Sequence, residues 1–255
     1  MSDLHAVTWG DGDPVVLVHG SFGWGEGTWS AQRPLADAFR LVVVDRRGFG
    51  DTPADGRVDF DRDADDVIAL LAEPSHLVGH SYGGVVCLLA AARREEAVRS
   101  LTVIEPPALA LARGRREVES FVAALATAAA EATDPADYLR RFRAAFGTTA
   151  DAGPLADKEL EAARSSWHER PPWEAEIPLD ALRRAPFPKL VVRGAWDVAP
   201  ATAQARGRPV FHAICDVLER ELEAEGVELA GAAHAPQALG EPFNERLREF
   251  LLREG

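Results

Sequence analysis

Short apolar runs alternate with longer amphipathic segments over much of the chain. Runs rich in Val, Leu and Ile predict buried strands at residues 14–19, 41–45, 75–79, 101–105, 190–193 and 227–230. Segments with apolar residues at helical spacing predict helices at residues 28–39, 60–72, 82–94, 204–224 and 241–252. Strands that alternate with helices are typical of an α/β fold, in which a mostly parallel sheet is covered by helices on both faces.

The strand pattern is interrupted in the middle of the chain. Residues 108–185 contain alanine-rich segments with helical periodicity, at 113–132, 135–146 and 155–167. A connection of this length is far longer than an ordinary loop. We therefore predict a helical cap, or lid, at 108–185, inserted into a core formed by 1–107 and 186–255. Two faint strands near residues 5–9 would complete an eight-stranded sheet, with the cap after its sixth strand.

Composition narrows the functional class. The chain has 255 residues and a formal net charge of −13, which argues against binding to nucleic acid or to an anionic membrane surface. The N-terminus shows no signal-peptide pattern, and no apolar stretch approaches the ~20 residues of a membrane helix. Cys87 and Cys215 lie in apolar, helix-like contexts and are expected to be buried free thiols. We expect a cytoplasmic protein that acts on a small molecule; the oligomeric state is not readable.

The stretch Gly79-His80-Ser81-Tyr82-Gly83-Gly84 lies between a predicted strand and a predicted helix. A Gly-x-Ser-x-Gly sequence in that setting is typical of a nucleophile elbow, a tight turn that exposes the serine hydroxyl at the carboxyl end of a sheet. The flanking glycines avoid side-chain collisions in the turn. Ser81 is therefore the predicted nucleophile.

A serine hydroxyl needs a general base, and the base needs a partner that fixes its tautomer. His234 follows the last predicted strand, and Asp197 follows the strand before it, so the order is Ser81, Asp197, His234. Glu105, at the end of the strand after the elbow helix, is the alternative acid. We prefer Asp197, because Glu105 precedes Pro106-Pro107 and could simply shape the entrance under the cap.

Acyl transfer also needs backbone N–H donors for the developing oxyanion. One donor is expected from Tyr82, directly after the nucleophile. The second is expected from Ser21 or Phe22, in the glycine-rich loop that follows His19-Gly20. Tryptophans on loops and in the cap are candidates to line the substrate pocket, namely Trp24, Trp167, Trp173 and Trp196.

Metal and nucleotide sites are not predicted. The aspartates at 59–66 do not have the spacing of a calcium loop, and no histidine shows metal-ligand spacing with a cysteine or an acidic cluster. The loop after the first buried strand lacks the Gly-x-Gly-x-x-Gly order of a dinucleotide site. We expect no cofactor and no metal.

Taken in order, His19-Gly20, Asp45-Arg46-Arg47-Gly48-Phe49-Gly50, the elbow, the Gly194-x-x-Asp197 turn and His234 resemble the α/β-hydrolase-fold superfamily. The resemblance covers nearly the whole chain except the cap. It implies a serine esterase with a catalytic triad that cleaves a small carboxylic ester, thioester or lactone through an acyl-enzyme.

The same resemblance leaves other reactions open. Similar proteins use this triad as carbon–carbon bond hydrolases, cofactor-free haloperoxidases or hydroxynitrile lyases, and a catalytically slow ligand-binding protein is a further alternative. Epoxide hydrolases and haloalkane dehalogenases have an aspartate at the elbow, so Ser81 excludes them.

Overall fold

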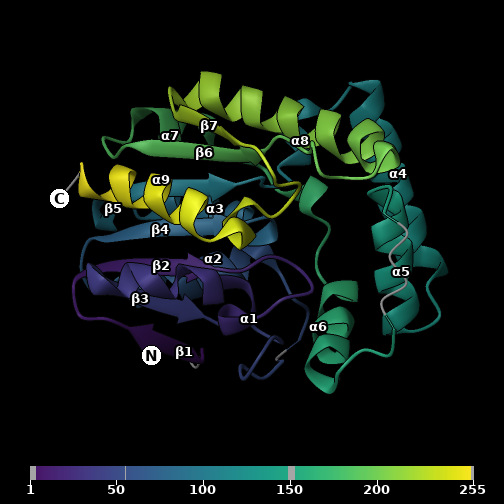
Figure 1. Ribbon diagram of the computed structural model, residues 1–255, viewed down its shortest axis with the longest axis horizontal. Helices are drawn as coiled ribbons and strands as arrows, with labels where there is room; N and C mark the ends of the chain where they lie inside the picture. The colour runs from purple at the N-terminus through teal and green to yellow at the C-terminus, as the bar shows by residue number, and fades with distance from the viewer. Residues whose placement is uncertain (1–3, 55, 149–152, 254–255) are drawn as a thin grey trace.

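A mostly parallel sheet forms the centre of the protein (Figure 1). The computed structural model describes residues 4–54, 56–148 and 153–253. Within them the sheet has seven strands in the order β1-β3-β2-β4-β5-β6-β7. The strands are β1 (Ala6–Trp9), β2 (Asp13–Val18), β3 (Phe39–Val44), β4 (Ser75–His80), β5 (Val98–Ile104), β6 (Lys189–Gly194) and β7 (Glu225–Leu229). Only β1 pairs antiparallel, with β3, so the predicted α/β class is confirmed.

The N-terminal part of the sheet differs from the prediction. Two strands were expected near residues 5–9, but the described residues contain one, β1. The chain then turns through Gly10, whose φ of 77° is in the left-handed region, and enters β2 at Asp13. Among the described residues, the sheet therefore has seven strands rather than the predicted eight.

Helices cover both faces of the sheet. One face carries α1 (Gly25–Trp29) and α9 (Glu241–Leu252), and the other carries α2 (Phe60–Leu70), α3 (Tyr82–Arg93), α7 (Leu179–Arg184) and α8 (Ala201–Leu222). The single helix expected at 28–39 is instead α1 followed by a 3₁₀ segment, Ser30–Asp37. Pro34 lies inside that segment, and a proline has no N–H to continue an α-helical ladder. Further 3₁₀ turns are Glu95–Ala97, Leu109–Ala112, Pro172–Glu174 and Pro236–Leu239.

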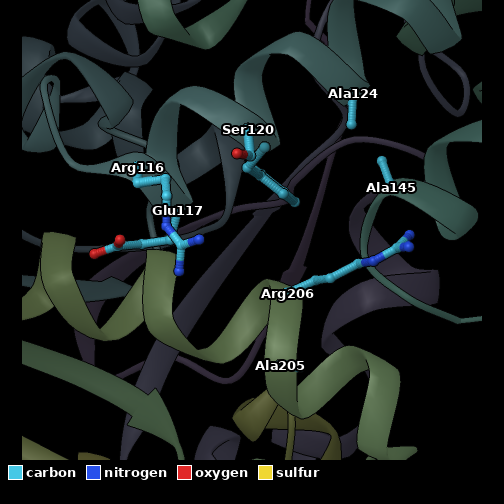
Figure 2. Close-up of a pocket in the computed structure, with 8 residues that line it drawn as sticks. Arg116, Glu117, Ser120, Ala124, Ala145, Ala205 and Arg206 are labelled. Atoms are coloured by element: carbon cyan, nitrogen blue, oxygen red, sulfur yellow. The ribbon is translucent and has the colours of Figure 1, made fainter.

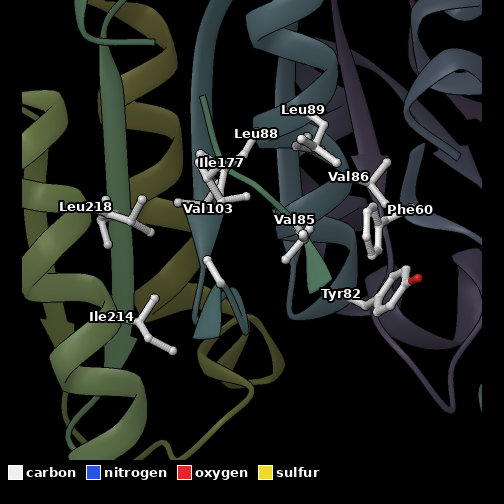
Figure 3. Packing of buried hydrophobic residues seen from close by; sticks show 14 of the residues in the cluster. Phe60, Tyr82, Val85, Val86, Leu88, Leu89, Val103, Ile177, Ile214 and Leu218 are labelled. Atoms are coloured by element: carbon white, nitrogen blue, oxygen red, sulfur yellow. The ribbon is translucent and has the colours of Figure 1, made fainter. Parts of the chain in front are cut away.

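The larger hydrophobic core lies between the sheet and the layer of α2, α3 and α8. Figure 3 shows side chains of α3 meeting Phe60 of α2 on one side, while Val103 of β5 lies among side chains of α3 and α8. α3 is buried on almost its whole circumference, including Val85, Leu88 and Cys87. Cys87 and Cys215 are both buried free thiols, as predicted. Burial of this kind fixes the start of α3, and so the position of Ser81.

The segment between β5 and β6 is helical in its described part. It contains α4 (Arg116–Glu131), α5 (Pro135–Ala145) and α6 (Asp157–Trp167), which lie beyond the carboxyl ends of the strands (Figure 1). Asp134 caps α5 by accepting a hydrogen bond from the Asp137 N–H, and Pro135 occupies its first turn. α7, also in this segment, packs against α3 and α8 instead. The division of the chain into a core and a cap at 108–185 stays a prediction.

None of the helices that the structure describes combines the length and the apolar character required to cross a bilayer.

Candidate active site

Ser81 lies at the junction of β4 and α3 with the backbone strain expected of an elbow. Its φ is 51° and its ψ is −125°, a conformation that side chains rarely adopt. A Cβ atom on Gly79 would lie 2.4 Å from the carbonyl oxygen of Gly83, and one on Gly83 would lie 2.3 Å from that of Val18. The two glycines are therefore required for the turn to pack against its neighbours.

His234 faces the nucleophile from the loop after β7. Its Nε2 atom is 3.0 Å from the Ser81 Oγ, within hydrogen-bonding distance. The carbonyl oxygen of His234 accepts a hydrogen bond from His80 Nε2 at 2.9 Å, so the residue before the nucleophile fixes the backbone of the base. Burial lowers the pKa of His234 below its ordinary value, which favours the neutral imidazole.

Glu105, and not Asp197, contacts the imidazole. The Nδ1 atom of His234 is 2.9 Å from Glu105 Oε2. The Asp197 carboxylate instead accepts hydrogen bonds from the N–H groups of Val198 and Gly231, at 3.1 and 2.9 Å, and is exposed to solvent. Our preference for Asp197 is thus corrected by the geometry. Asp197 closes a turn between two loops, and the carboxylate beside the imidazole comes from the end of β5.

The carboxyl group of Glu105 is completely buried and held by further donors. Its Oε1 atom accepts hydrogen bonds from the Gly194 N–H at 3.0 Å and from Trp196 Nε1 at 2.8 Å. Burial raises the pKa of Glu105 to about 8, while the bonds from Trp196 and Gly194 act in the opposite direction. The side chain therefore has a fixed orientation, with one oxygen toward Trp196 and the other toward His234.

Backbone strain is concentrated around these groups. Among the described residues, five that are not glycine have a positive φ, and four of them are at the site: Phe22, Ser81, Glu105 and Trp196. Each such conformation costs on the order of 1–3 kcal/mol and persists only where the surrounding packing enforces it. The fold therefore enforces unfavourable conformations at the residues that position the serine, the acid and the nearby loop.

Of the residues expected to supply the oxyanion donors, Tyr82 and Ser21 line the same cavity as Ser81. Tyr82 begins α3, so its N–H is among those without a partner inside the helix. The Phe22 N–H donates to the hydroxyl of Ser166, on α6, at 2.7 Å. The Ser21 hydroxyl donates to Glu169 Oε2. The cap thus places a hydroxyl oxygen against one of the N–H groups expected to receive the substrate's carbonyl oxygen.

An enclosed cavity of about 70 Å³ opens onto Ser81. Its wall includes Trp167 and Trp173, two of the four tryptophans predicted for the pocket. The other two do not line the cavity. Trp196 is buried and bonds Glu105, and the ring centre of Trp24 lies 5.6 Å from Lys158 Nζ. Both Trp167 and Trp173 lie in the predicted cap, and this position in the sequence was the basis for placing them at the pocket.

A larger hollow of about 440 Å³ lies away from the serine, between α4, α5 and α8 (Figure 2). Arg116, Glu117 and Ser120 line it from α4, and Arg206 lines it from α8. None of the residues that line it belongs to the serine–histidine–glutamate group. Size alone therefore does not identify the reactive site in this protein.

A buried ionic group that was not predicted from the sequence joins Arg46 and Asp63 to Glu169, in the segment between β5 and β6. Arg46 donates to Asp63 Oδ2 at 2.8 Å and to Glu169 Oε1 at 2.6 Å. Its guanidinium carbon lies 4.5 Å from the ring centre of Phe49 and 4.6 Å from that of Tyr82. In the sequence, Arg46 is visible only as part of the Asp45-Arg46-Arg47 run. Nothing distinguishes Glu169 from the other charged residues of the predicted cap.

Among the described residues, one group of side chains lies close enough together to bind a metal ion. Atoms of His5, Asp45 and Asp51 lie within 4.8 Å of one another. Asp45 already accepts hydrogen bonds from the Gly25 and Asp51 N–H groups, at 2.6 and 2.9 Å. These bonds give Asp45 a structural role in holding two loops together.

Comparisons with known proteins agree with this architecture. A family model described as "Alpha/beta hydrolase family" matches residues 15–246. The chain is 33% identical over 209 residues to a pimeloyl-(acyl-carrier protein) methyl ester esterase of Methylococcus capsulatus, covering 79% of this chain and 78% of that protein. An esterase of the same name from Aeromonas hydrophila is 36% identical over 107 residues, and the match spans 42% of its length.

The fold is also similar to solved structures. MenH from S. aureus superimposes with a TM-score of 0.72 at 13% identity, over 98% of each chain. An identity this low supports the fold and says nothing about the substrate. The sheet order, the strained serine and the family match over residues 15–246 agree with one another, and the chain belongs to the alpha/beta hydrolase family.

Proposed function

We propose that this protein is a serine hydrolase that cleaves a small carboxylic ester, thioester or lactone through an acyl-enzyme. The observation that carries the proposal is the continuous row of Ser81 Oγ, His234 and Glu105, with heavy-atom distances of 3.0 and 2.9 Å. A hydroxyl, an imidazole and a carboxylate in this geometry are suited to nucleophilic attack on a carbonyl carbon. The esterase names of the two relatives favour ester hydrolysis over the other reactions of the fold.

In the proposed mechanism, Ser81 attacks the carbonyl carbon while His234 Nε2 accepts the hydroxyl proton. Glu105 accepts a hydrogen bond from His234 Nδ1–H, selects that tautomer and stabilises the imidazolium. The carbonyl oxygen becomes negatively charged and accepts hydrogen bonds from the N–H groups of Tyr82 and Phe22. His234 then donates its proton to the leaving group, and water releases the acyl group by the same steps in reverse.

The size of the cavity favours small substrates. A volume of about 70 Å³ is about twice the ~30 Å³ that one water molecule takes up in the liquid. Short acyl chains are therefore the expected substrates, and longer chains require the cap to move. The Ser166 hydroxyl must also leave the Phe22 N–H before a carbonyl oxygen can bind there.

The test is trapping of the acyl-enzyme. Incubation with short p-nitrophenyl esters should give turnover. After rapid acid quenching and digestion with pepsin, mass spectrometry should show the acyl adduct on the peptide that contains Ser81. The Ser81→Ala variant should form no adduct and lose turnover while its melting temperature stays nearly unchanged. Activity of that variant within tenfold of the wild type would refute the assignment, and turnover of dienoic or cyanohydrin substrates alone would favour the carbon–carbon hydrolase or lyase reactions.

A further inference from the structure

The wall of the catalytic cavity combines two features that recognise positive charge. Aromatic side chains make up much of it: Tyr138, Phe142, Phe146, Trp167, Trp173 and Phe211. Glu169 is the one carboxylate among the described residues that line it. An apolar acyl group needs no carboxylate, and a buried carboxylate is unfavourable beside such a group. Arg46 and Ser21 compensate part of that cost, and the carboxylate still borders the cavity.

The aromatic rings form a continuous series from the cap to the base. Trp167 lies 6.2 Å from Tyr138 between ring centres, Phe142 lies 4.9 Å from Phe146, and Phe211 lies 4.3 Å from His234. The faces of aromatic rings carry partial negative charge, and several rings around one space attract ammonium groups. This wall is therefore suited to a cationic group as well as to an apolar one.

The buried ionic group at the wall contains two carboxyl groups and one guanidinium. The side chain of Glu169 is 7% exposed and that of Asp63 is 3% exposed, and both carboxyl groups bind the single guanidinium of Arg46. With both carboxylates ionised, this buried group has a net charge of −1. Burial raises the pKa of both Glu169 and Asp63, despite the opposing effect of Arg46. A cation in the cavity would supply the missing charge without any rearrangement of Arg46.

We propose that Glu169, together with the aromatic wall, selects substrates that carry a protonated amine or a quaternary ammonium group close to the scissile acyl bond. This inference rests on the proposed function and specifies its substrate class. The Ser21 hydroxyl, which donates to Glu169, fixes the carboxylate directly beside the oxyanion loop. A substrate with a carboxylate at the same position would be repelled.

The test compares esters of the same shape and different charge. One series consists of 2-(dimethylamino)ethyl acetate, 3-methylbutyl acetate and 3-acetoxypropanoate, which vary the alcohol portion. The other consists of methyl 3-(dimethylamino)propanoate, methyl 4-methylpentanoate and monomethyl succinate, which vary the acyl portion. At neutral pH, kcat/KM in at least one series should be at least about tenfold higher for the cationic ester than for its neutral isostere, and lowest for the anionic ester.

Two variants separate the effect of Glu169 from that of overall charge. Glu169→Gln keeps the shape of the side chain and removes its charge, so the preference should fall below about threefold. Glu174→Gln removes a charge from an exposed carboxylate paired with Arg170, and the preference should be unchanged. Equal rates for cationic and neutral esters in both series, or an unaltered preference in Glu169→Gln, would overturn the proposal.

A binding measurement keeps this proposal separate from the hydrolase assignment. Ser81→Ala should bind tetramethylammonium chloride with a saturable change in tryptophan fluorescence, because Trp167 and Trp173 line the cavity. Sodium chloride at the same concentration should give no such change, and adding Glu169→Gln should weaken the binding at least about tenfold. Binding without turnover by the wild type would support the cation site while contradicting the hydrolase, and absence of binding would overturn the cation site itself.

Discussion

The imidazole of His234 lies 2.9 Å from Glu105, at the end of β5, while Asp197, at the end of the neighbouring β6 strand, bonds the Gly231 N–H. Substituting the two acids should therefore have very different effects. Glu105→Gln should lower kcat by about 10²–10⁴-fold, because the imidazole loses the partner that fixes its tautomer. Asp197→Asn should change kcat by less than about threefold. Steady-state kinetics on a short p-nitrophenyl ester would measure both, and the reverse ranking would restore Asp197 as the acid.

The pH dependence should report the ionisation of the coupled pair. The active form has a neutral His234 and an ionised Glu105, and burial raises the pKa of Glu105 to about 8. As the pH falls through this value, protonation of the pair removes the active form, so kcat/KM should rise with pH and level off above about 8. In Glu105→Gln, the remaining activity should titrate at lower pH, because burial lowers the pKa of the His234 ring. A wild-type rate that does not change between pH 5 and 9 would contradict His234 as the base.

Trp196 should act as a positioning residue through its hydrogen bond to Glu105. That bond lowers the pKa of the carboxyl group, so Trp196→Phe should move the pH profile of kcat/KM to higher pH. Activity at pH 7 should fall several-fold and be largely recovered at pH 9, a recovery that simple loss of packing would not produce. Trp24→Phe is the control, since Trp24 is absent from the residues that line the catalytic cavity.

In the proposed mechanism, the hydroxyl of Ser166 competes with the substrate for the Phe22 N–H. A hydrogen bond of this kind contributes about 1 kcal/mol net, so Ser166→Ala should preserve kcat/KM or raise it by up to about fivefold. Ser165→Ala is a matched control on the same helix, because the Ser165 hydroxyl bonds the Gly48 carbonyl oxygen and not an oxyanion donor. A loss of more than tenfold in Ser166→Ala would mean that this hydroxyl assists the reaction directly.

The proximity of Ser81 and His234 could be predicted because local sequence determines the setting of each residue. Gly79 and Gly83 are required by the close approach of backbone atoms at the elbow, and that requirement is visible as spacing in the sequence. His234 is the histidine that follows the last strand. For these two residues, the motif and the strand order together were sufficient.

The acid was mispredicted because Asp197 and Glu105 both follow strands of the sheet. Their distinction depends on which strand neighbours β4 and on the direction of each side chain. β5 pairs directly with β4, and the Nε1 atom of the buried Trp196 ring donates a hydrogen bond to Glu105. The local sequence does not show that β5 is the neighbour of β4, and it does not show where the Trp196 ring lies. Glu169 was not predicted for a related reason, because its contact with Arg46 depends on how two distant segments of the chain pack together.

The positions of the non-glycine residues with a positive φ have a consequence for attempts to make the protein more heat-resistant. Relaxing Phe22 or Trp196 with glycine would relieve the backbone and at the same time remove a side chain that packs around the reacting groups. Glu223, with a φ of 52° at the end of α8, is the fifth such residue and lies outside the site. Glycine there should raise the melting temperature, by a stabilisation of about 1 kcal/mol, with no change in turnover. Engineering for durability should therefore begin at the far end of α8 and leave the four strained residues of the site, Ser81 included, as they are.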